Sequence, residues 1–159
     1  MKGTAMPNKP NPSEALFRKR FAAFKKLSEE LGEQGALERM FDGYPEKHRK
    51  RMGQYIDTTT LAEGFRNAIS EFNSGGWEME VVDLSNKGVD AVLEIQKVCP
   101  AEDVCKEFGY EKPCFLVCDI DGQATKEVFP EIRARSLCTQ ADGACVCMFM
   151  FEREPIGKQ

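Results

Sequence analysis

Seven cysteines give this 159-residue chain its most versatile chemistry. A thiol can be a nucleophile, a metal ligand or a small apolar core group. An odd number of thiols cannot all pair within one chain, and we expect a cytoplasmic, reducing environment, so a disulfide framework is not expected. The spacing contains no C-x2-C pair, so the usual signature of structural zinc is absent. Catalysis, metal binding and burial remain as roles for these thiols.

Cys99 lies where an expected strand ends and Pro100 begins a short helix. The free N–H groups and the positive dipole end of a helix favour a thiolate over a thiol. Such a thiolate would be a good nucleophile and a good metal ligand. The alternative is a small buried residue at a strand end, and the position alone leaves both interpretations open.

Cys118 has a similar setting, because it closes an apolar segment that we expect to be a strand, residues 114–118. Asp121 follows it and is placed to cap the next helix, which is the commoner use of such an aspartate. Together, however, Cys118 and Asp121 could hold a metal ion or transfer a proton. Cys145 and Cys147 are two apart on an expected strand, so they share a face, and core packing is favoured for Cys145.

The single histidine, His48, lies in a basic run at residues 46–51. With one histidine, the common zinc hydrolase sites and Ser-His-Asp triads are largely excluded. The fold could still bring His48 next to a cysteine, so a Cys–His catalytic pair is left open. The run lacks interleaved aromatic residues, and the chain has a net charge of −4 and a pI near 5.2. We therefore expect a solvated helix face there and no nucleic-acid partner.

The elements that must position these residues follow from hydrophobic periodicity. We expect an α+β fold with N-terminal helices packed on a mainly antiparallel sheet with short helical inserts. The last strand is apolar on both faces, so it should lie centrally in the sheet. Residues 1–10 should form a flexible arm and residues 11–159 a single domain, without a membrane span or signal peptide. The expected helices are 12–31, 34–41, 60–73, 100–108 and 122–129, and the expected strands are 77–83, 89–95, 114–118, 132–138 and 144–151.

An ordered set of short motifs resembles the L-2-amino-thiazoline-4-carboxylic acid hydrolase family. Members show a cysteine before a short helix that ends in glycine, then C-x-x-D, then a closing G-A-x-x-C-D-F. A helical lead-in at residues 27–40 is also similar to the family. The matching segments here are 98–101 (VCPA), 107–109 (EFG), 118–121 (CDID), 130–133 (PEIR), Thr139, 143–144 (GA) and 147–151 (CMFMF).

The resemblance implies hydrolysis of the C=N bond of a cyclic thiazoline, which opens the ring to an N-carbamoyl cysteine. That reaction needs a nucleophile, an acid for the leaving group and a cation for the substrate carboxylate. If the cysteines bind a cofactor, zinc or another divalent metal is the one that we expect. The residues so implied are Cys99, Cys118 and Asp121 for catalysis, Arg133, Arg135 and Thr139 for substrate binding, and Cys99, Cys118 and Cys147 for a metal.

The chain departs from the family at positions that bear on activity. Ser136-Leu137 stands where the family has Arg-Thr, with Arg135 one place off, and Met148 replaces the aspartate of C-D-F. The alternative function is therefore a non-catalytic domain that binds a metal or a small ligand with the same cysteines. A third interpretation is an interaction protein whose thiols are simply core. The expected partner is a small molecule, and homo-oligomer formation is left open.

Overall fold

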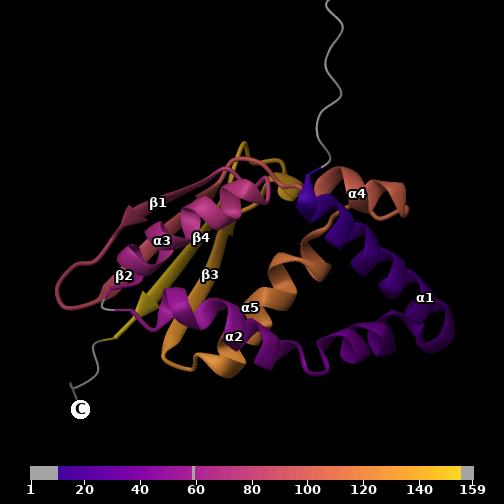
Figure 1. The fold of residues 1–159 in the computed structure, drawn as a ribbon, viewed down its shortest axis with the longest axis horizontal. Coiled ribbons are helices and arrows are strands. Elements are labelled where there is room, and N and C mark those ends of the chain that lie inside the picture. The colour runs from indigo at the N-terminus through magenta and orange to yellow at the C-terminus, as the bar shows by residue number, and fades with distance from the viewer. Residues whose placement is uncertain (1–10, 59, 155–159) are drawn as a thin grey trace, which may run out of the picture.

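The structure is a computed structural model that describes residues 11–58 and 60–154. It confirms the expected α+β class, with a helical N-terminal half and an antiparallel sheet (Figure 1). The helices are α1 (Pro12–Phe41), α2 (Tyr44–Ile56), α3 (Leu61–Ser74), α4 (Glu102–Glu107) and α5 (Cys118–Val128), with 3-10 turns η1 (Cys114–Leu116) and η2 (Gln140–Asp142). The strands are β1 (Met79–Asp83), β2 (Asp90–Gln96), β3 (Ile132–Cys138) and β4 (Cys147–Arg153). The expected arm at 1–10 lies outside the described residues.

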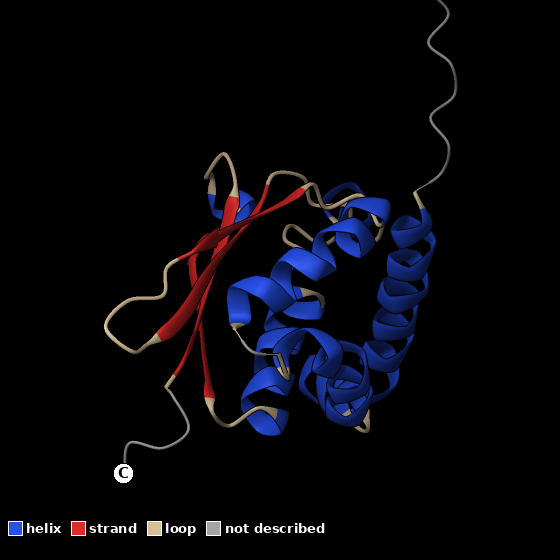
Figure 2. Ribbon diagram, turned by 60° about the vertical axis from the view of Figure 1, so that its left-hand side comes forward, coloured by secondary structure: helices blue, strands red, loops and turns tan. Residues whose placement is uncertain are grey.

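The sheet has the strand order β1-β2-β4-β3, and every neighbouring pair is antiparallel. The prediction that the last strand is central is therefore confirmed for β4. The α-helices lie on one side of the sheet, and within the described residues no α-helix covers the other side (Figure 2). None of the described helices is long and apolar enough to cross a membrane.

Local signals place the helices of the N-terminal half. Asn11 caps α1, since its side chain accepts a hydrogen bond from the backbone N–H of Ser13. Gly32 breaks the regular helix within α1 with φ +74°, which agrees with the expected stop at this glycine. Thr60 caps α3 by accepting from the N–H of Glu63 at 3.2 Å. These boundaries depend on neighbouring residues, so the sequence predicts them well.

The expected strand at residues 114–118 is wrong, because this segment forms η1 and the start of α5. Its apolar side chains point into the helical core, where Leu116 is fully buried and Val117 nearly so. A short apolar run has no period that separates a buried strand from a buried turn. As a consequence Cys118 begins α5, and Asp121 lies inside that helix instead of capping it.

The buried side chains form two separate cores. The sheet core lies between the sheet and α2, α3 and the end of α5, around Phe65, Val92 and Phe129. The helical core lies between α1, α4 and η1, around Phe21 and Phe24. Aromatic side chains dominate the helical core, which includes edge-to-face contacts of Phe24 with its neighbours.

Candidate functional site

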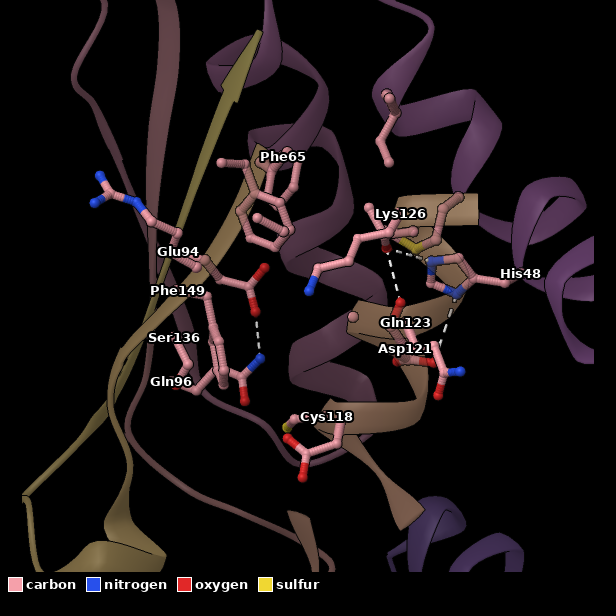
Figure 3. A pocket seen from close by; sticks show the side chains of 18 of the residues that line it. His48, Phe65, Glu94, Gln96, Cys118, Asp121, Gln123, Lys126, Ser136 and Phe149 are labelled. Carbon is pink, nitrogen blue, oxygen red and sulfur yellow. Dashed lines mark hydrogen bonds and ion pairs between the residues drawn. The ribbon is translucent and has the colours of Figure 1, made fainter. Parts of the chain in front are cut away.

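A cavity of about 500 Å³ lies between α5 and the covered face of the sheet. Figure 3 shows the two walls, with side chains of α5 on one side and side chains of the strands on the other. Part of the lining is aromatic, from Phe65, Phe72, Phe149 and Phe151. A cavity of this size with a largely apolar lining and a few polar groups is typical of a small-molecule site. The polar part is formed by side chains that include Glu94, Gln96, Cys118, Asp121, Lys126 and Ser136.

Glu94 is the buried carboxylate of this cavity. It lies on β2 opposite Phe149 of β4 and is only 5% exposed. Gln96, on the same face of β2, donates a hydrogen bond to it. Burial raises the pKa of Glu94 to about 7, because the low-dielectric surroundings disfavour the charged form. A carboxyl group that is partly ionised near neutral pH is suited to general acid–base chemistry.

Lys126 lies on α5 across the cavity from Glu94. Its side chain extends toward the sheet, with the amine on the side of Glu94 (Figure 3). The residue is exposed, so the amine lies where the cavity meets solvent. Among the described residues no carboxylate lies within 4.0 Å of this amine. Lys126 is therefore available to bind an anionic group.

Asp121 is held by three side chains of α2. Tyr44 donates its hydroxyl hydrogen to the carboxylate, and Nη2 of Arg51 donates to both oxygens at 3.1 and 3.2 Å. Nδ1 of His48 lies 3.5 Å from Oδ1. Burial alone would raise the pKa of Asp121, but His48, Arg51 and Tyr44 together hold it below its usual value. A carboxylate so stabilised is a poor proton donor, which weakens its predicted role as an acid.

The expectation of a solvated face at residues 46–51 is wrong for His48, which is only 4% exposed. Its Nδ1 lies 3.1 Å from Nη2 of Arg51, and its Nε2 lies 2.9 Å from Oγ1 of Thr125. No cysteine is among its hydrogen-bond partners in the described structure. The signal that could have revealed this burial is the spacing of His48, Met52 and Ile56, which puts one residue per turn on the inner face of α2.

The structure brings together the three cysteines expected to converge. Cys99, Cys118 and Cys147 line one small cavity of about 20 Å³, and Cys114 joins them. Cys118 also lines the larger cavity, so the two cavities share a wall. Sulfur from three separate stretches of the chain, at residues 99, 114–118 and 147, therefore lines a space about large enough for one water molecule.

Of the two interpretations left open for Cys99, its surroundings favour the buried, protonated thiol. Burial raises its pKa to about 11, although the backbone N–H groups of Ala101 and Glu102 act in the opposite direction. Burial likewise raises the pKa of Cys118 well above its usual range and raises that of Cys147. The sequence correctly predicts backbone N–H groups beside Cys99, but it cannot show that the effect of burial on the pKa is larger than theirs. All three sulfurs carry protons near neutral pH.

The metal set Cys99, Cys118 and Cys147 remains a prediction. Within residues 11–58 and 60–154 no group of three His, Cys, Asp or Glu side chains is arranged to hold a metal ion. Protonated, desolvated thiols are also poor ligands until they lose their protons. The residues as they stand do not fit a metal, so no step of the chemistry below uses one.

The predicted substrate-binding residues lie away from the interior of the cavity. Arg135 borders it, but its Nη2 lies 3.6 Å from a carboxylate oxygen of Glu152 on the opposite side of the sheet. Arg133 shares that side and pairs with Glu152 at 3.9 Å. Thr139 caps η2 and lines only the small cavity. Lys126 is the basic side chain that faces the cavity, and the sequence motifs do not single it out.

The two departures from the family motif differ in their consequences. Met148 pairs with Ile95 on the uncovered side of the sheet, so this position places no side chain in the cavity. Ser136 does line the cavity, next to Phe149 of β4. The replacement at position 148 therefore removes no carboxylate from the site, whereas position 136 contributes to its wall.

Comparisons with known proteins agree with this fold. The model of the family described as L-2-amino-thiazoline-4-carboxylic acid hydrolase matches residues 12–151. Among solved structures, the chain is similar to the phenol-responsive sensory domain of the transcription activator PoxR, whose crystal structure contains phenol. That similarity has a TM-score of 0.54 and 15% sequence identity, and it covers 91% of this chain and 76% of the other. At this identity it shows the fold alone. A comparison with curated proteins finds no match.

Proposed function

The chain belongs to the L-2-amino-thiazoline-4-carboxylic acid hydrolase family, and from this membership we propose that it opens a cyclic amidine carboxylate by hydrolysis. One observation carries the proposal. A buried carboxyl group with a pKa of about 7, Glu94, and a cation, Lys126, lie on opposite walls of one cavity of ligand size. A group that activates water and then returns the proton, and a cation that binds the substrate carboxylate, are functions that the reaction requires.

Glu94 is the proposed general base. It accepts a proton from a water molecule whose oxygen bonds to the amidine carbon between the ring nitrogen and the ring sulfur. As that bond forms, the electron pair of the C=N bond passes to the ring nitrogen, which takes up the proton held by Glu94. The tetrahedral intermediate then collapses as its hydroxyl becomes the carbonyl, the bond between that carbon and sulfur breaks, and the hydroxyl proton passes through Glu94 to the leaving sulfur. The product is a carbamoyl group and a free thiol. Gln96 supports this role because its hydrogen bond fixes the Glu94 carboxylate in the wall.

Water is the proposed nucleophile in place of a cysteine. The pKa of Cys118 is raised well above its usual range by burial, so the thiolate is scarce at neutral pH. Cys118 contributes an uncharged thiol to the cavity wall. Lys126 takes the carboxylate-binding role that the family resemblance implied for Arg133 or Arg135.

The cavity also bears on the size of the substrate. A volume of about 500 Å³ is in the range that holds drug-sized ligands, larger than one five-membered ring with an amino group and a carboxylate. The remaining space adjoins Phe65, Phe72 and Phe151, which would otherwise face water. We therefore include in the proposed substrate class rings that carry an apolar substituent.

The test is turnover of 2-amino-thiazoline-4-carboxylate and of its aryl-substituted analogues, followed by mass spectrometry of the ring-opened product. The rate should rise with pH through about 7 as Glu94 ionises. Glu94→Gln should lower kcat by roughly 100-fold, and Lys126→Met should mainly raise KM. Lys106→Met, which changes an exposed lysine on α4, is the matched control and should leave both constants unchanged. Turnover that persists in Glu94→Gln would refute the proposed base.

Binding without turnover is the second candidate function. It is favoured by the aromatic lining and by the protonated state of the cysteines. The similar fold of a phenol-responsive sensory domain is compatible with it. Ligand-induced increases in melting temperature with phenol or the thiazolines, in the absence of any product, would support this function over hydrolysis.

A further inference from the structure

Gly122 lies in the interior of α5, a position where glycine disfavours a helix relative to alanine. In the part of the chain that the structure describes, every other glycine has a structural reason. Each of them has a φ in the left-handed region, or an added Cβ would lie 3.3 Å or less from another atom. At Gly122 neither condition holds, since an added Cβ would meet no atom within 4 Å. Neither the backbone nor the packing of the protein therefore explains this glycine.

Gly122 is part of the wall of the larger cavity. Cys118 and Lys126, about one helical turn to either side of it, line the same cavity, so these three residues share one face of α5. An added Cβ at Gly122 would enter the cavity, because the space around that position is free. Between the side chains of Cys118 and Lys126 the wall is therefore bare helix backbone.

This bare part of the wall lies at the level of the proposed base. α5 enters the turn at residues 129–132 and β3 leaves it, so the two elements run in opposite directions from one end of the cavity (Figure 1). Gly122 lies roughly 10 Å from this turn along the helix, and Ser136 roughly 13 Å from it along the strand. Ser136 pairs with Phe149, which pairs with Glu94. The missing side chain therefore leaves space beside the row of the sheet that contains Glu94.

We propose that Gly122 is a specificity-determining residue, because its missing side chain leaves the space in which the cavity accepts a ring that carries an apolar substituent. The inference rests on the proposed function for the chemical class of the ligand. A small ring in a cavity of about 500 Å³ has room to move away from an added methyl group. A ring with a phenyl substituent fills more of the cavity and has no such room. The size of residue 122 therefore decides between the two ligands.

Calorimetric titration with 2-amino-thiazoline-4-carboxylate and with its 5-phenyl analogue tests the proposal. The parent protein is Glu94→Gln, which lacks the proposed base and leaves both ligands intact. Adding Gly122→Ala should raise the dissociation constant of the phenyl analogue by roughly tenfold and that of the unsubstituted ring by less than about twofold. Adding Gly122→Leu in its place should weaken the phenyl analogue by roughly 100-fold. Alanine favours the helix, so the melting temperature of Gly122→Ala should be no lower than that of the parent.

The matched control is Asn67→Ala, which changes an exposed residue of α3 that does not line the cavity. It also favours the helix, and it should leave both dissociation constants unchanged. A parent protein that binds neither ring, a Gly122→Ala variant with unchanged affinity for the phenyl analogue, or a lower melting temperature in that variant would each overturn the proposal. Turnover by the wild-type protein is measured separately. Selective binding without turnover would refute the proposed hydrolysis and leave this role of Gly122 standing.

Discussion

Glu94 is buried in the wall of the cavity, where it accepts a hydrogen bond from Gln96. Its ionisation should therefore make the free energy of unfolding depend on pH. Its folded pKa of about 7 is above the ordinary value of 4.5. The stabilisation of the protonated form is complete below about pH 4.5 and is lost as pH rises to about 7.

We therefore predict that the free energy of unfolding falls by about 3 kcal/mol more in the wild-type protein than in Glu94→Gln between pH 4.5 and pH 8. Urea unfolding at several pH values measures both slopes. Parallel slopes in the two proteins would contradict a raised pKa at this residue. Glutamine is the appropriate replacement, because it keeps the size of the side chain and removes the charge.

Thiol reactivity provides a second prediction for single residues. Cys145 is exposed, whereas Cys105 and Cys147 are buried and Cys99 has a pKa of about 11. In the native protein at neutral pH, a maleimide should label Cys145 about 100-fold faster than these three. Peptide mass spectrometry after timed labelling gives the order directly. Rapid labelling of Cys99 would contradict this prediction and would support the alternative that Cys99 is a thiolate at a helix N-terminus.

The contact between α2 and α3 depends on a glycine. A Cβ at Gly64 of α3 would collide with the carbonyl oxygen of Tyr55 in α2. Gly64→Ala should therefore lower the free energy of unfolding by about 3 kcal/mol. Gly122→Ala in α5 is the control, because its Cβ meets no atom within 4 Å, and it should stabilise the protein by about 0.5 kcal/mol. Thermal unfolding of the two variants distinguishes the cost of a steric clash between helices from the gain in helix propensity that alanine brings.

The ends of helices and strands were predicted from the sequence more successfully than the burial of individual side chains. The boundary at Thr60 and the strand Ile132–Cys138 agree with the prediction, because caps and alternation are local signals. The burial of Glu94 was not predicted, since it depends on which face of the sheet the helices cover. The burial of His48 was not predicted either, because it depends on the contact of α2 with Thr125 and Phe129 at the end of α5. Alternation on β2 shows that Glu94 and Leu93 point to opposite sides. It cannot show that the side with the glutamate is the covered one.

At the scale of the whole molecule, one ion pair joins several elements. Arg153 at the end of β4 binds Asp90 at the start of β2 through Nη2 at 2.7 Å. The same arginine donates to the carbonyl oxygens of Ile56, the last residue of α2, and of Thr58. Asp90 accepts from the N–H of Leu61 in α3. Sheet and helices are thus connected at a single, partly buried cluster.

Arg153→Met should lower the free energy of unfolding by roughly 3 kcal/mol, because it leaves Asp90 partly buried without its cation. Lys112→Met breaks an exposed ion pair with Asp142 and should change stability by no more than about 0.5 kcal/mol. Denaturant unfolding of the two variants under identical conditions measures the difference. Equal effects would mean that the cluster adds nothing beyond a surface pair.

The two separate cores described above imply that this molecule need not open all at once. The sheet core contains the strands and the Arg153 cluster, while the helical core depends on contacts among α1, α4 and η1. In amide hydrogen exchange, α1 and α4 should open at a lower free energy than β2 and β4, as two distinct cooperative units. Cys99 and Cys118 lie beside the helical core, and Cys105 lies within it. Breathing of that half would therefore expose thiols that the closed form keeps from solvent, while the sheet stays folded.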